Sequence, residues 1–338
     1  MGEGNTPFVS RQIDGNEVHF KLDFLQPSGS FKDRGASVLV SLLRHIGVKK
    51  VIEDSSGNAG AALSAYAAAA GIEATIYVPE YTPEGKVVQM RMYGSKVVKV
   101  PGQRQDANVA ALKAAEECMY ASHLWHPIFI LGLSTQAYEI WENMGRCIPQ
   151  SVILPVGSGG LLEGLYQGFS HLCRAGFSNP ECSGPECSDP ECSDPECSDP
   201  ECSDPECSDR VPRFIGVQAA RCAPIHTAFQ RNMDDYTDME VETTIAEGIA
   251  VQKPPRARAV LSVIRKSGGY TVSVEEEEIV DAGERLSRMG LFVEPTSASV
   301  MAAWQKLERR DREGAVLVLT GSGLKAITTY GGLLKRKR

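Results

Sequence analysis

Short apolar runs alternate along the chain with longer segments in which apolar residues recur every three or four positions. This alternation predicts an α/β fold in which helices cover sheets of parallel strands. The runs expected to form strands are residues 51–54, 74–79, 96–100, 151–156, 214–218 and 315–320. Helices are expected at residues 59–70, 83–93, 106–120 and 275–289, with one more beginning at Leu161. Asp106 is well placed to be the N-cap of its helix.

One segment departs from this alternation. Residues 180–209 are six tandem copies of Pro-Glu-Cys-Ser-Asp, with Gly replacing Asp in the first copy. A proline at every fifth position excludes both a continuous helix and a central strand. We therefore expect a disordered acidic insertion between a helix and a strand. A metal-binding tract is the alternative, but cysteines five residues apart without histidine match no defined zinc site, so no metal ligand is predicted.

The net charge of −8 is concentrated in the same repeat, whose six Glu and five Asp leave +3 for the other residues. No stripe of basic residues with interleaved aromatics is present, which argues against nucleic acid as a partner. No apolar run reaches about 18 residues, so no membrane span is predicted. The first residues lack the basic and apolar regions of a signal peptide, and we therefore expect a cytoplasmic protein.

Three predicted strand–helix loops carry residues suited to chemistry, and ligands of open α/β sheets bind at such loops. In residues 27–35, Lys32 lies in a Gly- and Ser-rich turn, where its amine can form a Schiff base with an aldehyde cofactor. A surface charge is the plainer alternative. Residues 157–160, Gly-Ser-Gly-Gly, precede a helix and suit a phosphate, although a tight turn also needs glycine. Residues 55–60 offer hydroxyl, amide and N–H donors for a carboxylate or phenolic oxygen, or simply cap a helix.

These loops occur together with further motifs, in order along the chain. The chain resembles the pyridoxal 5′-phosphate (PLP) enzymes grouped with tryptophan synthase β-chain, serine/threonine dehydratases, cysteine synthases and threonine synthases. Within that group it is most similar to threonine synthase and threonine-synthase-like proteins. The resemblance covers nearly the whole chain apart from residues 178–210. Besides the three loops, the matching segments are 3–7, 85–89, 135–139, 216–218, 246–249, 294–298 and 320–325.

The resemblance implies a fold of the tryptophan synthase β type, with two α/β lobes of parallel sheets and the cofactor in the cleft between them. The small lobe would comprise residues 36–130. The large lobe would comprise residues 1–35 and 131–338, with the repeat inserted in it. Such enzymes generally form homodimers, and the partner expected here is a small amino-acid substrate.

The resemblance also assigns roles to single residues. Lys32 would hold PLP as a Schiff base and, once released by substrate, would act as acid and base at the α-carbon. Phe31 and Gly248 would lie on the two faces of the cofactor ring, and Thr320 would meet the ring nitrogen. A hydroxyl there leaves this nitrogen largely unprotonated, which suits elimination or replacement at β or γ carbons.

The remaining roles concern the oxygens of cofactor and substrate. The cofactor phosphate would be held by Gly157, Ser158, Gly159, Gly160 and Leu161. The substrate would be held by Ser55, Ser56, Gly57, Asn58 and Ala59. Asn58 would in addition bond the ring's 3′-oxygen, and Ser56 would take part in catalysis.

We expect a PLP-dependent lyase, threonine-synthase-like, that catalyses β/γ-elimination or replacement on a small amino acid. A serine/threonine ammonia-lyase is the alternative, because residues 246–249, Ala-Glu-Gly-Ile, follow the dehydratase pattern more closely. A cysteine-synthase-like activity is less expected, since that branch has Ser-Val where this chain has Ser30-Phe31. A regulator without activity would not need a Schiff-base lysine.

The substrate of threonine synthases, O-phosphohomoserine, brings a second phosphate into the cleft. By resemblance, the family binds it largely through an Asn-Ser pair, an Arg, and an Asn at the end of the cofactor's phosphate loop. In this chain those places are taken by His123 and Leu124, by Phe129 and by Leu161. The two leucines and the phenylalanine offer no side-chain donor, and burying a phosphate without donors is costly. We therefore expect O-phosphohomoserine to be a poor substrate, and threonine or serine to fit better.

Overall fold

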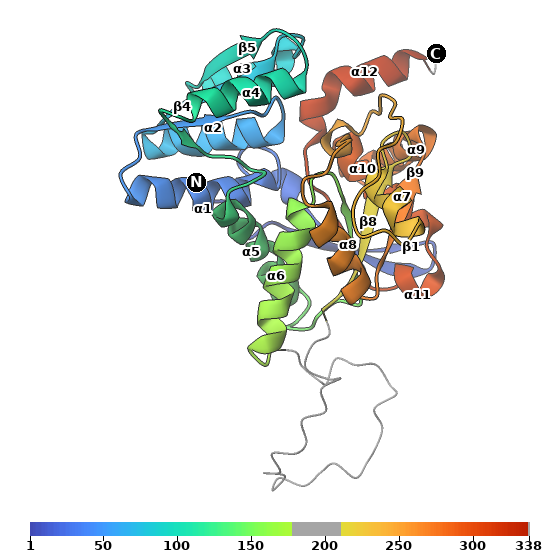
Figure 1. The fold of residues 1–338 in the computed structure, drawn as a ribbon. Coiled ribbons are helices and arrows are strands. Elements are labelled where there is room, and N and C mark those ends of the chain that lie inside the picture. Colours follow the sequence, from blue (N-terminus) through green and yellow to red (C-terminus); the bar gives the residue numbers. More distant parts are fainter. Residues whose placement is uncertain (178–210, 337–338) are drawn as a thin grey trace, which may run out of the picture.

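The computed structural model describes residues 1–177 and 211–336, whose strands form two separate sheets (Figure 1). The larger sheet has the strand order β1-β2-β10-β7-β8-β9. Its strands are β1 (Phe8–Ile13), β2 (Asn16–Lys21), β7 (Ser151–Pro155), β8 (Arg213–Ala219), β9 (Tyr270–Val274) and β10 (Ala315–Val318). Neighbouring strands are parallel, except that β1 and β2 form an antiparallel hairpin turning at Asp14 and Gly15, both at positive φ. The repeat expected at 180–209 lies outside the described residues.

The smaller sheet has four parallel strands in the order β5-β4-β3-β6. They are β3 (Lys50–Glu53), β4 (Glu73–Pro79), β5 (Lys96–Val100) and β6 (Met119–Tyr120). The predicted α/β fold with lobes of parallel sheet is therefore confirmed, with the β1–β2 hairpin as an antiparallel addition at one edge.

Helices cover both faces of the larger sheet. The helices of the described residues are α1 (Lys32–His45), α2 (Asn58–Ala70), α3 (Glu84–Met92), α4 (Arg104–Ala114), α5 (Pro127–Asn143), α6 (Gly160–Arg174), α7 (Pro224–Gln230), α8 (Ala257–Lys266), α9 (Glu276–Arg288), α10 (Pro295–Lys306), α11 (Arg309–Arg312) and α12 (Ile327–Arg336). The 3₁₀ turns are η1 (Asp23–Leu25), η3 (Glu247–Ile249) and η4 (Gly323–Ala326). Ile215 and Val217 of β8 pack with α9 and α10, whereas Phe214 packs with α6 and α8 on the other face, because successive residues of a strand point to opposite sides.

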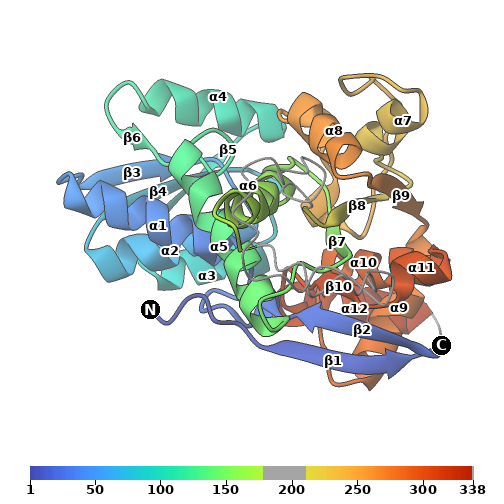
Figure 2. The same cartoon turned by 90° about the horizontal axis from the view of Figure 1, so that it is seen from below.

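Helices α5 and α6 pack against each other between the two sheets (Figure 2). Phe129 and Leu133 of α5 belong to the core of the smaller sheet. Ala137 and Ile140 of the same helix belong to a core of the larger sheet. One helix therefore contributes to the cores of both lobes and brings loops from the two sheets near each other.

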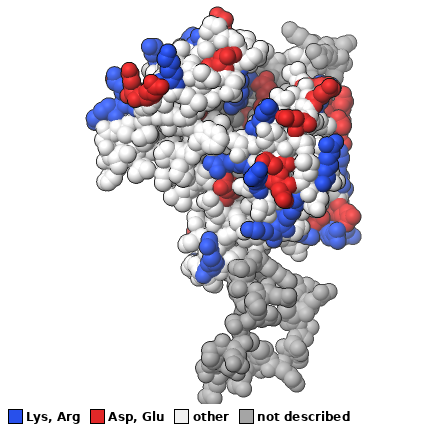
Figure 3. All heavy atoms as spheres, viewed as in Figure 1, with Lys and Arg blue, Asp and Glu red and all other residues white. Residues whose placement is uncertain are grey.

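Charges on the face shown in Figure 3 are of mixed sign over the lobe of the larger sheet. Two arginines of α8 illustrate this: Arg258 pairs with Asp235 at 2.8 Å, and Arg265 with Asp234 at 3.0 Å. At least one partner in each pair is exposed, so each contributes about 1 kcal/mol of stability or less.

The predicted boundaries agree with the structure to within a few residues, apart from the segment 106–120. Helix α4 ends at Ala114, and Met119–Tyr120 forms strand β6, which pairs with β3. The prediction of one helix was wrong because pairing with a neighbouring strand overrides the local helical pattern. The N-cap was wrong as well: Gln103 is the N-cap, and Asp106 closes a capping box from the third helical position.

Candidate active site

The loop before α1 carries Lys32 to the carboxyl end of β10. The N–H of Phe31 donates to the carbonyl of Thr320 at 2.8 Å, and Ser30 forms an antiparallel bridge with Gly321. The structure therefore brings together three of the predicted site residues, which come from opposite ends of the chain.

The side chain of Lys32 is half-buried beside two aromatic rings. Its Nζ lies 4.7 Å from the ring centroid of Phe31 and 5.7 Å from that of Phe129. The amine makes no hydrogen bond or ion pair with any residue that the structure describes. Burial, opposed by the charge of Glu53, lowers the pKa of this amine from 10.5 to about 8. An appreciable fraction is therefore unprotonated near neutral pH and can act as a nucleophile.

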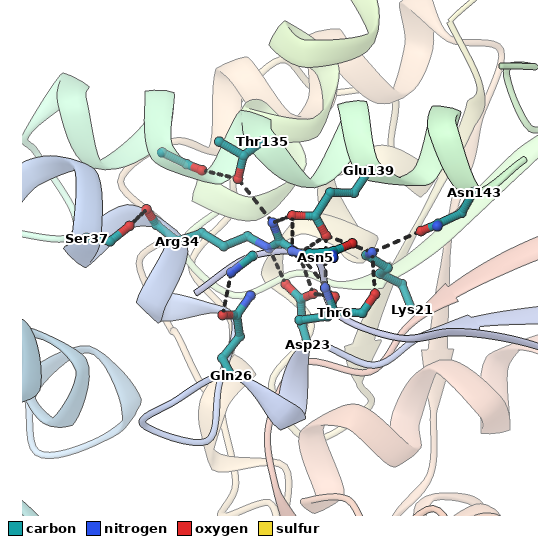
Figure 4. A network of polar contacts seen from close by, with 12 residues as sticks. Asn5, Thr6, Lys21, Asp23, Gln26, Arg34, Ser37, Thr135, Glu139 and Asn143 are labelled. Carbon is teal, nitrogen blue, oxygen red and sulfur yellow. Dashed lines mark hydrogen bonds and ion pairs between the residues drawn. The ribbon is translucent and has the colours of Figure 1, made fainter. Parts of the chain in front are cut away.

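A buried cluster of charges holds the helix that begins at Lys32 (Figure 4). We call it the Arg34 cluster, and it consists of Lys21, Asp23, Arg34 and Glu139. The guanidinium of Arg34 donates to both carboxylate oxygens of Asp23 and both of Glu139, at 2.6–2.9 Å. Lys21 Nζ lies 2.7 Å from Glu139. Burial acts to raise the pKa of Glu139, but hydrogen bonds and charge from Arg34 and Lys21 lower it to about 2.

The turn from β7 into α6 presents unpaired donors. Gly159 is the N-cap of α6 at φ +94°, and a Cβ there would come within 2.3 Å of Val260, so the turn needs glycine. No side chain caps the helix, and the N–H groups of residues 157–159 donate to no acceptor among the described residues. Ser158 is half-buried and Leu161 is buried. Free N–H groups at a helix N-terminus favour an anion such as phosphate.

Gly248 lies against this turn. A Cβ on Gly157 would approach the carbonyl oxygen of Gly248 to 3.0 Å, and the N–H of Gly248 donates to Thr296 Oγ1 at 3.0 Å. The next residue, Ser297, shares a hydrogen bond of 2.9 Å with the hydroxyl of Thr320. The start of α10 therefore links the turn before α6 to the end of β10 and so to the loop before α1.

Asn58 reaches the same place from the smaller sheet. It is the first residue of α2, and its side-chain amide donates to the two carboxylate oxygens of Glu294 at 3.1 and 3.2 Å. Glu294 is the N-cap of α10, and its N–H donates to the carbonyl of Gly321 at 2.9 Å. The three loops singled out in the sequence thus converge around the end of β10.

The other residues of the third loop surround the start of α2. Ser55 is buried, and its Oγ accepts a hydrogen bond from the N–H of Gly57 at 3.3 Å, while Ser56 is half-buried. Ala59 is buried in the first turn of α2, which has no side-chain cap. This N-terminus suits a second anion for the same reason as that of α6.

Glu53 belongs to this site but was not assigned from the sequence. It is the last residue of β3 and 1% exposed, and its carboxyl bonds both Nδ1 (2.7 Å) and the backbone N–H (3.1 Å) of His123. The ring of His123 packs edge-on against Phe129, which also lies beside Lys32. The available signal was the pair Glu53-Asp54 at the end of an apolar strand, since carboxylates are rarely buried there without a reason.

Comparison with known proteins identifies the chemistry of these loops. The family model described as pyridoxal-phosphate dependent enzyme matches residues 1–321. The chain belongs to this PLP-dependent family. The predicted cofactor and the prediction of a PLP-dependent enzyme are therefore confirmed.

Sequence relatives point to one branch of the family. A threonine synthase from Methanocaldococcus jannaschii is 33% identical over 335 residues, which cover 96% of this chain and 75% of that protein. A threonine synthase from Synechocystis is 30% identical over 334 residues, with 96% and 77% covered. The predicted similarity to threonine synthases is confirmed.

Solved structures share the fold. Maize serine racemase superposes with a TM-score of 0.75 at 21% identity, covering 98% of this chain and 92% of that one. A bacterial threonine deaminase, from T.th., superposes with a TM-score of 0.73 at 25% identity, covering 94% and 92%. The two-lobed architecture is thus that of PLP-dependent enzymes.

The residues present fit the cofactor. An amine without a partner suits its aldehyde, and the unpaired N–H groups before α6 suit its phosphate. The hydroxyl of Thr320, at the end of β10, suits the unprotonated nitrogen of its ring.

Proposed function

We propose that this enzyme holds PLP on Lys32 and catalyses elimination or replacement at the β or γ carbon of a small amino acid, in the threonine-synthase-like manner. The bound cofactor would supply an aldehyde for the substrate's amino group and a sink for the electron pair released at the α-carbon. The observation that carries the proposal is the amine of Lys32, which has no partner among the described residues and a pKa of about 8. It lies where the three loops converge.

The chain's own residues would then divide the work. Lys32 would remove or return the proton at the α-carbon, with Phe31 and Gly248 on the two sides of the ring. Thr320 would face the ring nitrogen, and Asn58, whose amide Glu294 already orients, would face the 3′-oxygen. The N–H groups at the start of α6 would hold the phosphate, and those at the start of α2 the substrate carboxylate.

We propose further that the substrate's side chain is neutral, as in serine or threonine. Phe129 stands where the resemblance places an arginine, and it packs so closely on Gly35 that a Cβ there would lie 2.4 Å from its ring. This wall beside Lys32 therefore offers no donor to a second phosphate. The carboxyl of Glu53, buried near the same lysine, makes the wall still less favourable for a dianion.

O-phosphohomoserine is the second candidate, and Arg104 favours it. This exposed first residue of α4 makes no ion pair with any described residue. Its charge disfavours protonation of Lys32 and of His123, so it lies near the site. The relatives named threonine synthase favour the same substrate.

Steady-state assays of the holoenzyme with serine, threonine and O-phosphohomoserine separate the two candidates. We expect a keto acid from serine or threonine, and a kcat/KM for O-phosphohomoserine at least about tenfold lower, or 1.4 kcal/mol in transition-state binding. Efficient release of phosphate and threonine from O-phosphohomoserine, with no keto acid from the others, would establish a threonine synthase. In that case Arg104→Gln should abolish most of the activity.

We also propose that the enzyme works in the cytoplasm as a homodimer, on the strength of its resemblance to the family. Light scattering should then give twice the chain mass of 36.6 kDa. The helices of the described residues include none that is long and apolar enough to cross a membrane.

A further inference from the structure

A buried pair, Glu53 and His123, lies at the carboxyl edge of the smaller sheet. Glu53 ends β3 two residues before Ser55, and His123 follows β6, the strand beside β3. Ligands of parallel sheets bind at this edge. The ring centroids of His123 and Phe129 are 6.2 Å apart, and Phe129 in turn lies 5.7 Å from Lys32 Nζ. The pair therefore belongs to the wall beside the reactive amine.

The pair leaves one nitrogen of the imidazole without a partner. Nδ1 of His123 is 2.7 Å from Oε1 of Glu53, so one proton is shared between these atoms. No described residue bonds Nε2. Burial raises the pKa of Glu53 to about 8, against the hydrogen bond from the His123 N–H and the charge of Lys32. Burial and the charge of Lys32 hold the pKa of His123 well below 6.5. A protonated carboxyl beside a neutral ring is favoured, and in that state Glu53 donates to Nδ1 while Nε2 carries a proton.

We propose that Nε2 of His123 protonates the oxygen that leaves the β-carbon of the substrate, and that Glu53 resupplies the proton through Nδ1. The inference rests on the proposed function, elimination from an amino acid with a side-chain hydroxyl. Hydroxide is a poor leaving group, and a positioned acid accelerates such a step by about 10²–10⁴-fold. The neighbouring wall residue, Phe129, has no proton to give.

The protons and electrons of the step balance. The α-carbon gives its proton to Lys32, and the electron pair of that C–H bond forms the double bond between the α- and β-carbons. The bond from the β-carbon to oxygen breaks, and its electron pair stays on the oxygen. Nε2 gives that oxygen its proton, and the Glu53 carboxyl passes its own to Nδ1. Water leaves, and the pair regains one proton from solvent.

Charged groups from several elements surround the pair. Lys32 of α1, Arg104 of α4 and Arg256 before α8 disfavour a charged ring on His123, whereas Asp54 after β3 favours it. Three cations against one carboxylate keep the ring neutral. The acid form of the pair is lost when the Glu53 carboxyl ionises, so kcat for serine should fall as the pH rises through about 8.

The dependence on the leaving group tests the inference. In the holoenzyme, His123→Gln should lower kcat for serine by about 100-fold or more. It should change kcat for β-chloroalanine less than about threefold, because chloride leaves without a proton, and a general acid gives its 10²–10⁴-fold only to a leaving group that needs one. His126→Gln is the matched control: it lies three residues further on and caps α5, where its ring accepts from the N–H of Ile128. The control should keep both activities and the cofactor spectrum. Equal losses on both substrates, or no loss on serine, would overturn the inference.

A second variant and a second readout cover a failure of His123→Gln to fold. Glu53→Gln can still donate to Nδ1 but cannot pass on a proton, so it should show the same selective loss on serine. Nitrogen-15 NMR of labelled histidine should find Nε2 protonated at neutral pH and Nδ1 protonated above about pH 8 in the wild type. In Glu53→Gln the proton should stay on Nε2 throughout. A wild-type ring protonated on Nδ1 at neutral pH would contradict the relay.

The same experiments separate the inference from the proposed function. A wild type that forms no keto acid from serine or threonine overturns both. A wild type that forms it, together with a His123→Gln variant that is unselective between leaving groups, overturns the inference alone.

Discussion

Two buried glutamates near the start of α1 are ionised in opposite ways. Burial acts to raise the pKa of both. In the Arg34 cluster, donors from two cations nevertheless bring the pKa of Glu139 down to about 2. Glu53 bonds only His123 and has no cation in contact among the described residues, and its pKa rises to about 8. The partner, and not burial, decides whether a buried carboxyl keeps its charge.

The difference separates structure from chemistry. The Arg34 cluster keeps its charges over the whole physiological range, because two carboxylates face two cations, and it joins α1 to β2 and α5. The pair of Glu53 and His123 can exchange a proton near neutral pH. Groups with such a pKa beside a nucleophile are typical of active sites. One cluster thus fixes the position of Lys32, and the other is suited to work with it.

Breaking the Arg34 cluster should have the largest effect on stability. Glu139→Gln leaves two buried cations with one carboxylate, which typically costs about 3–5 kcal/mol. Denaturant unfolding at pH 7 measures the loss. The folded-state pKa of about 2 lies below the ordinary 4.5, so the stability from Glu139 is present above pH 4.5 and is lost as the pH falls toward 2. The difference between variant and wild type should therefore shrink in acid.

A matched control lies on the same helix. Glu142 of α5 is exposed, and Glu142→Gln should change the free energy of unfolding by less than about 0.5 kcal/mol. A Glu139→Gln variant as stable as this control at pH 7 would show that the cluster does not hold α1 in place.

Glu53→Gln should change stability with the opposite dependence on pH. The folded-state pKa of about 8 lies above the ordinary 4.5, so the cost of burying this carboxyl grows as the pH rises from 4.5 to 8. The variant should therefore gain on the wild type with rising pH, by on the order of 1–3 kcal/mol. Melting temperatures at pH 5 and pH 8.5 measure this. A difference that is the same at both pH values would contradict the contrast with Glu139.

Removing residues 180–209 should have the smallest effect. Helix α6 is complete at Arg174 and strand β8 begins at Arg213, and loop-closure entropy changes slowly with loop length. We expect PLP binding to persist and kcat/KM to change by less than about tenfold, or 1.4 kcal/mol. A variant that folds but loses more activity would mean that this segment touches the site.

Much of the fold could be predicted because periodicity is local. Strands such as 151–155 and helices such as 58–70 repeat their pattern within a few residues. The two-residue strand β6 could not be found in this way, since only its pairing with β3 defines it. The lobe boundaries, 36–130 against the rest, stay a prediction.

The site could be predicted only where motifs mark it. Lys32, the turn before α6 and the loop before α2 were found as short motifs, and their roles toward PLP stay proposals. The Arg34 cluster and the pair of Glu53 with His123 were missed, because their partners lie 70 to 105 residues apart. Which acid meets which base depends on the finished fold, and a single sequence does not contain that information in any local pattern.

The most direct test of the central claim is reduction of the holoenzyme with borohydride, followed by peptide mapping. The purified protein should be yellow, and the reduced cofactor should be found on the peptide that contains Lys32. Lys325 is an internal competitor, since its side chain lies against Gly29 in the same loop and is half-buried. An adduct on Lys32 alone is the result that the account predicts. An adduct on Lys325 or another lysine, or none at all, would contradict it.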